Sequence, residues 1–192
     1  MERIISQSFS SREQESFARM KQFIANAFGN TPFEMNLCQT MGAFSAKYIK
    51  LDLPLAPENV LEKINLVEIE ITDNCFTFSY HQPVKQDISS ERGCIAANAI
   101  NEFLDNLPLR CIYQQYCHTF EIVSVFHSPD AVVTAINGLL CVLEYISILA
   151  PYLDGTCTPE QESQIFEALA ACCGYVDHHS FPSQNIYTQV SG

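Results

Sequence analysis

The sequence of 192 residues is poor in basic side chains, and the few it has are unevenly placed. It carries 10 Lys and Arg against 22 Asp and Glu, a formal net charge of −12. The last base is Arg110, so residues 111–192 hold acids only. Nucleic acids and anionic membranes are bound by clusters of Lys and Arg. This shortage argues against both as partners and favours a protein with a basic surface.

Glycine is scarce as well. The seven glycines stand apart from one another, and no glycine-rich phosphate loop is present. No strong catalytic motif accompanies them, so we expect neither catalysis nor a cofactor. The first eight residues contain no apolar run of signal-peptide length. The nine cysteines are odd in number and irregular in spacing, which favours reduced thiols and a cytoplasmic location.

One apolar stretch, residues 131–153, is long enough to span a membrane. Its only charge is Glu144, which would lie inside the hydrocarbon, and no Lys or Arg follows the stretch. We therefore expect a helix buried in a core or a subunit interface, with no direct membrane insertion. Glu144 is expected to reach the surface in a narrow polar stripe with Thr134 and Asn137.

Hydrophobic periodicity predicts four helices. The first begins with the Ser10-x-x-Glu13 capping box and ends near Gly29, and the second runs from Ser89 or Ser90 to Leu107. The third follows Ser128-Pro129-Asp130, and the fourth follows Thr158-Pro159-Glu160. Between the first two helices we expect a loop at residues 30–42, and a short helical turn at residues 58–64.

Alternation predicts five strands: residues 43–53, 66–71, 75–80, 109–117 and 119–126. Asp73-Asn74 is expected to form a two-residue hairpin turn that pairs Ile71 with Phe76, Ile69 with Phe78 and Val67 with Tyr80. The register of residues 109–127 stays open, because the turn there lacks Gly or Asn. The fold class is therefore α+β, an antiparallel sheet of about five strands with packed helices in the order α-β-β-β-α-β-β-α-α. We expect one domain at 1–157 and an extra helix and tail at 158–192 packed on it.

Two groups of side chains suggest chemistry. Cys172, Cys173, His178 and His179 lie within eight residues, but adjacent ligands point in different directions, so metal binding stays an open alternative to buried thiols. Cys94, Cys117, His118 and His127 supply the residue types of a cysteine nucleophile and its base. Neighbouring residues such as Cys117 and His118 point apart in a strand, so the pattern alone does not make a catalytic pair.

Three apolar groups are the candidate surface for a protein partner. They lie on the first helix, the hairpin and the third helix: Phe17, Met20 and Ile24; Phe76, Phe78 and Tyr80; and Leu139 and Leu143. Each is also a natural core position, because all of them follow the period of their element.

The order of elements from Ser10 to Ala150, with the acidity, resembles the small acidic secretion chaperones of bacterial pathogens, the Tir-chaperone type of type III systems. It is also similar to the accessory adaptors of type IV secretion coupling complexes. The chain differs in its length and in the acidic segment after Thr158. The resemblance implies a non-catalytic protein that forms a homodimer or hetero-complex and binds a segment of a secreted effector or secretion-machine subunit.

The leading hypothesis is thus a cytoplasmic chaperone or adaptor. Two alternatives remain open: a small cysteine-dependent enzyme, and an acidic decoy or inhibitor that covers a basic surface on its target.

Overall fold

The computed structural model describes residues 9–40, 43, 45–54, 66–84 and 88–173. It confirms the α+β class and the antiparallel sheet. The sheet has six strands in the spatial order β1-β2-β3-β4-β6-β5. Their bounds are β1 Glu34–Gln39, β2 Lys47–Asp52, β3 Leu66–Ile71, β4 Phe76–Pro83, β5 Arg110–Gln114 and β6 Thr119–Phe126.

The sixth strand is β1, which lies in the segment expected to be a loop. Its alternation is weak because Glu34, Asn36 and Gln39 interrupt the apolar residues, and Pro32 stands just before it. Pairing with β2 in continuous register, Glu34 opposite Asp52 and Gln39 opposite Lys47, makes it a strand. Tertiary pairing here overrides a weak local preference.

The hairpin prediction is confirmed: Ile71 lies opposite Phe76, and Ile69 opposite Phe78. The structure also supplies the register of the last two strands, with Cys111 opposite Ile122 and Gln114 opposite Thr119. β4 continues beyond the expected end to Pro83 and pairs with β6 along its whole length.

Among the described residues, four α-helices and two short 3₁₀ turns accompany the sheet. They are α1 Ser11–Phe28, α2 Ser90–Phe103, η2 Leu104–Asn106, η3 Pro129–Ala131, α3 Val132–Leu153 and α4 Pro159–Cys173. The expected caps are present on α1 and α2, where Ser10 and Ser89 accept hydrogen bonds from the helix backbone. The expected turn at 58–64 and the tail after Cys173 lie outside the described residues, and the domain limits stay a prediction.

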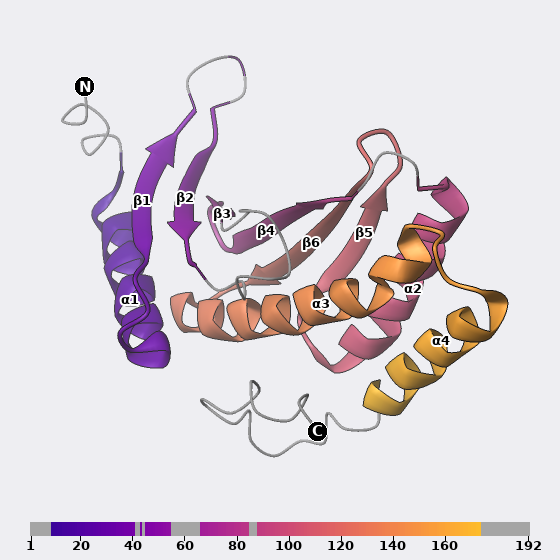
Figure 1. Ribbon diagram of the computed structural model, residues 1–192. Helices are drawn as coiled ribbons and strands as arrows, with labels where there is room; N and C mark the ends of the chain where they lie inside the picture. The colour runs from indigo at the N-terminus through magenta and orange to yellow at the C-terminus, as the bar shows by residue number, and fades with distance from the viewer. Residues whose placement is uncertain (1–8, 41–42, 44, 55–65, 85–87, 174–192) are drawn as a thin grey trace.

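One face of the sheet is the core face. Ile49, Ile69 and Phe78 have no exposed surface there, whereas Lys50 and Glu68 stand on the other face and are half-exposed. α3 runs across the sheet from α1 at one end to α2 and α4 at the other (Figure 1). α1 contacts η3 and α3, while α2 contacts β5, α3 and α4. The core thus lies between the sheet and the helices.

α3 is the apolar helix of the sequence. The segment Pro129–Leu153 is long and apolar enough to cross a membrane, but half of it is buried within this fold. Phe103 of α2 stacks on Tyr145 of α3, with ring centroids 3.9 Å apart. Glu144 and Thr134 are exposed and Asn137 is half-buried, so the predicted polar stripe is confirmed.

Candidate functional site

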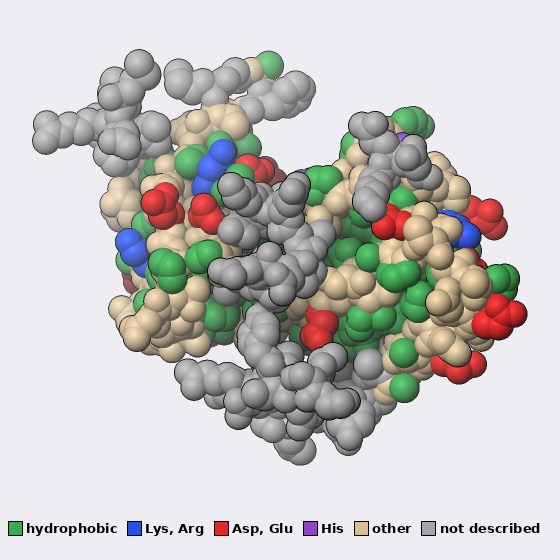
Figure 2. Space-filling view, in the orientation of Figure 1, with side chains coloured by type: hydrophobic (Ala, Val, Ile, Leu, Met, Phe, Trp, Pro, Cys, Tyr) green, Lys and Arg blue, Asp and Glu red, His purple; other side chains and the backbone are tan. Residues whose placement is uncertain are grey.

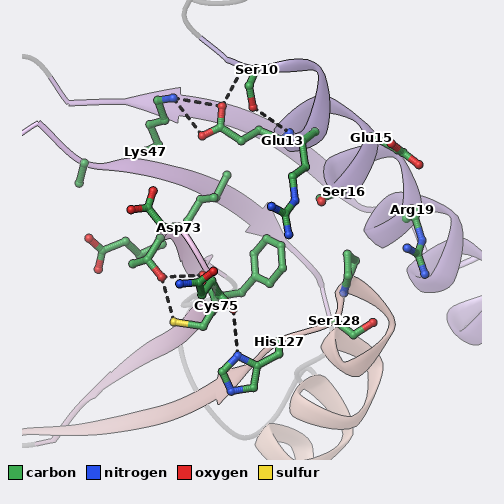
Figure 3. A pocket seen from close by; sticks show the side chains of 18 of the residues that line it. Ser10, Glu13, Glu15, Ser16, Arg19, Lys47, Asp73, Cys75, His127 and Ser128 are labelled. Carbon is green, nitrogen blue, oxygen red and sulfur yellow. Dashed lines mark hydrogen bonds and ion pairs between the residues drawn. The ribbon is translucent and has the colours of Figure 1, made fainter.

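The described part of the chain forms a groove of about 680 Å³, which we call the α1 groove. One wall is the N-terminal half of α1, and the opposite wall is the β3–β4 turn (Figure 3). His127 and Ser128, which follow β6, lie between these walls at one end. The residues that line the groove therefore come from parts of the chain that are far apart in sequence: residues 10–19, 39, 45–47, 70–76 and 127–129.

Glu13 anchors the first wall. Its carboxylate accepts the backbone N–H of Ser10 at 2.6 Å, and the Ser10 hydroxyl accepts the N–H of Glu13 at 3.2 Å. This capping box fixes the start of α1. The same carboxylate accepts two hydrogen bonds from Lys47 of β2, at 2.9 and 3.0 Å, which ties α1 to the sheet. Burial alone would raise the pKa of Glu13, but the hydrogen bonds from Lys47 and Ser10 together bring it below its ordinary value.

Arg12, Ser16 and Arg19 also line this wall. Their spacing of four and three residues places them along one side of the helix. In η3, the hydrogen bond from Ser128 is the main cause that lowers the pKa of Asp130, and the charge of Arg19 lowers it further. Arg12 is exposed and makes no ion pair or hydrogen bond within the described part of the chain. One guanidinium at the groove is therefore available to a ligand.

The opposite wall is acidic. The two-residue turn Asp73-Asn74 is closed by the Thr72 N–H, which donates to the carbonyl of Cys75 at 3.0 Å. Glu70 and Asp73 line the groove from this wall, and neither forms a hydrogen bond or ion pair with another described residue. The α1 groove thus carries unpaired charges of both signs: Arg12 and Glu15 on the α1 wall, and Glu70 and Asp73 on the opposite wall.

Cys75 and His127 are the residues of the groove that suggest nucleophilic chemistry. The Cys75 sulfur lies 2.9 Å from the Thr72 hydroxyl. The His127 Nδ1 lies 2.9 Å from the carbonyl oxygen of Asn74. A carbonyl only accepts, so Nδ1 carries the proton in this contact, and a neutral ring leaves Nε2 as an acceptor. The imidazole holds the hairpin turn to the end of β6 and does not hydrogen-bond the thiol.

The nucleophile candidates of the sequence do not meet as one set. His118 and His127 flank opposite ends of β6. At the His118 end, the ring Nδ1 lies 3.0 Å from the Tyr113 hydroxyl, and Gln115 donates to the Cys94 sulfur at 3.6 Å. Burial raises the pKa of Tyr113, and the charges of ionised Cys94 and Cys117 raise it further. Cys94, Cys117 and His118 therefore surround a tyrosine, while His127 belongs to the α1 groove.

Six of the eight predicted partner-binding residues lie in the core of the chain: Met20, Ile24, Phe76, Phe78, Tyr80 and Leu139, each at most 9% exposed. Phe17 and Leu143 are half-buried and pack against that core. The periodic stripes of the sequence are core stripes, because every one faces another element of the same chain. Contact of these residues with a partner stays a prediction. The six core residues would have to become exposed to make such a contact, because they are buried in this conformation.

The four candidate metal ligands fall outside the part of the chain that the structure describes. These are the side chains of Cys172 and Cys173, and the residues His178 and His179. Within the described residues, no group of three His, Cys, Asp or Glu side chains is placed to hold a metal ion.

Sequence reasoning missed Arg12, Glu70 and Asp73 as site residues. The only sequence signal was that Arg12 and Arg19 are charges on the outer side of a helix, which ordinarily means a solvated face. No protein-family model, curated protein or solved structure matches this chain.

Proposed function

We propose that this protein is a non-catalytic adaptor or chaperone that binds a polypeptide segment of a partner in the α1 groove. The observation that carries the proposal is that charges of both signs line the groove, Arg12 on the α1 wall and Glu70 and Asp73 on the other, unpaired within the described part of the chain. Each group is solvated in the free protein and gains a partner when a ligand of matching charge enters.

The charge of the groove selects the kind of ligand. A small anion meets Glu70 and Asp73, and a small cation meets Arg12, so either would face repulsion from one wall. A polypeptide segment carries side chains of both signs and a backbone of donors and acceptors, and it satisfies both walls at once. The half-buried side chain of Ile71 also lines the groove and gives such a segment an apolar surface to cover.

The partner follows from the resemblance in element order and acidity. We propose a secreted effector or a secretion-machine subunit, held in the cytoplasm. The long acidic segment from residue 111 keeps the chain soluble and repels other acidic proteins.

A charge reversal tests the proposal. The partner is first identified by mass after copurification from the native host, and its binding is then measured with purified components. Arg12→Glu is expected to weaken binding at least tenfold, because a new acid meets the acids of the segment. The matched control is Arg110→Glu, an exposed residue on β5 away from the groove, which is expected to bind as the wild type does. Equal binding by Arg12→Glu and wild type would contradict the proposal.

Cys75 and His127 favour one second candidate, a cysteine-dependent enzyme, because they line the same groove. Such an enzyme needs the thiolate at neutral pH and a base within hydrogen-bond reach of it. Limited alkylation at neutral pH separates the two functions. An adaptor predicts that Cys75 reacts no faster than the exposed Cys117, whereas an enzyme predicts that Cys75 is modified first.

A further inference from the structure

The two edges of the sheet differ in how their backbone groups are satisfied. At the β5 edge, the side-chain amide of Asn101 on α2 donates to the carbonyl of Cys111 at 2.7 Å and accepts its N–H at 2.8 Å. Asn101 therefore takes the place of a neighbouring strand at this position and blocks the edge.

The alternation of hydrogen bonds identifies the outward groups of β1. Thr40 donates to the carbonyl of Ala46 at 2.9 Å, so residues 40 and 46 are a hydrogen-bonded pair that continues the β1–β2 register. Such pairs alternate along an antiparallel ladder. The N–H and C=O groups of Met35, Leu37 and Gln39 consequently point away from β2, toward the free edge. None of these three residues has a hydrogen bond to another described residue across that edge.

β1 also lacks the features that keep an edge from pairing. It contains no Pro and no Lys, and its register with β2 has no bulge. Apolar side chains accompany the edge: Phe33 stands just before the strand, and both Phe33 and Leu37 are only partly buried against the core. Phe23 of α1 is 36% exposed. This end of the molecule therefore combines an unblocked strand with apolar surface.

We propose that two copies of this chain pair through β1, antiparallel and about a two-fold axis that passes through the sheet at Leu37. This register uses all three outward residues: Leu37 lies opposite Leu37 of the second copy, and Met35 lies opposite its Gln39. Each hydrogen-bonded pair exchanges two hydrogen bonds. The only charge of the strand, Glu34, then lies opposite Thr40, so no like charges meet. A two-fold operation matches one surface with itself, which is the commonest closed assembly of soluble proteins.

The dimer gives the protein one continuous antiparallel sheet with both copies' helices on the same side. Gln39 and Lys47 at the β1–β2 end line the α1 groove, so the two grooves flank the shared strand pair. Dimer formation through β1 does not depend on ligand binding in the groove, and it is tested by measuring the oligomeric state.

Leu37→Pro tests the pairing at the backbone. It removes an outward N–H and leaves the β1–β2 hydrogen bonds intact, and proline is tolerated at such edge positions. By light scattering across a dilution series, the wild type is expected at twice the 21.6 kDa of one chain and the variant at a single chain. Leu37→Val keeps the N–H and is the matched control, expected to stay dimeric. Circular dichroism checks that each variant is folded.

A crosslink tests the register without disturbing the backbone. Residues 36 and 38 of opposite copies form a non-hydrogen-bonded pair, with Cα atoms about 4.5 Å apart, within the range that a disulfide spans. Asn36→Cys therefore sets a new thiol against the native Cys38 of the second copy. Oxidised glutathione is reduced to two glutathione thiols, which take up the two electrons and the two thiol protons of each disulfide formed. A covalent dimer linked from position 36 to Cys38 is expected, and its loss in the double variant Asn36→Cys/Cys38→Ser is the control.

A wild-type chain that runs as a single species across the dilution series overturns the proposal. So does a dimer that survives Leu37→Pro and yields no link between position 36 and Cys38, because the interface then lies elsewhere. A strand of a different protein found on β1 in place of the second copy overturns it as well.

Discussion

The guanidinium of Arg92 donates to Glu162 at 2.9 Å and to the backbone carbonyl of Tyr152 at 2.7 Å. Arg92 lies in the first turn of α2, whereas Glu162 lies in α4, within the segment that contains no base. This ion pair joins the segment to a base of the N-terminal part of the chain. Gly155, at φ +65°, lets the chain between α3 and α4 pass beside the same guanidinium. One basic residue from the N-terminal half thus holds the last helix in place.

Arg92→Ala is expected to lower the free energy of unfolding by about 1–2 kcal/mol. The ion pair itself contributes little because Arg92 and Glu162 are 33% and 30% exposed, but the Tyr152 carbonyl also loses its donor. Urea denaturation measures the loss, and hydrogen exchange is expected to rise in α4 before the sheet. Arg110→Ala, on an exposed side chain of β5, is the control. Unchanged protection of α4 would contradict this account.

Asn101→Ala is expected to cost about 1–3 kcal/mol, because it leaves the N–H and the carbonyl of Cys111 without partners. It also opens the second edge of the sheet, so we expect species larger than the wild-type assembly by size-exclusion chromatography. Asn98 is an exposed residue of the same helix, so Asn98→Ala should change neither the free energy of unfolding nor the size of the assembly. An Asn101→Ala chain with wild-type stability and mass would show that Asn101 does not block the β5 edge.

Low pH should remove the contribution of Glu13 to the free energy of unfolding. Its folded pKa is lowered from 4.5, so the stability that it adds is complete above that value and is lost as the pH falls through the lowered one. At pH 7 we expect Glu13→Gln to be less stable than wild type by about 0.5–1 kcal/mol, and the difference should vanish near pH 3. Glu15→Gln, an exposed acid on the same helix, gives the baseline. A gap that persists at low pH would mean that the capping geometry, and not the charge, is responsible.

Burial predicts the order in which the thiols react. It raises the pKa of Cys111 to about 12, whereas Cys117 is exposed. Only the thiolate is nucleophilic, so at neutral pH the buried Cys111 should be alkylated far more slowly than the exposed Cys117. Time-resolved mass spectrometry of iodoacetamide adducts measures both rates. Comparable rates in the folded protein would contradict the burial of Cys111.

The sequence predicts those elements whose signals are local. The Ser10 and Glu13 capping box and the Asp73-Asn74 hairpin are short-range patterns, and both are present. β1 was missed because its Glu34 and Asn36 weaken the alternation, and only pairing with β2 reveals the strand. Apolar stripes such as Met20 and Ile24 have the same period whether they meet another helix or a partner, so periodicity alone did not separate core from contact surface.

The α1 groove could not be predicted from the sequence, for a different reason. Arg12 and Asp73 lie sixty-one positions apart, and the β2–β3 pairing and the packing of α1 bring them to the same hollow. Neither residue belongs to a motif, and each would be read alone as a solvated charge. Their joint role follows only from the tertiary structure.

Photo-crosslinking from a position inside the α1 groove tests most directly whether a partner segment occupies this groove. A benzoylphenylalanine at Ser16, which lines the groove, is compared with one at Ser163, an exposed residue of α4. The partner identified by copurification is expected to become attached at position 16 through one defined peptide, and position 163 is expected to yield no adduct. A partner that binds fully yet attaches only at position 163, or at neither position, would contradict it.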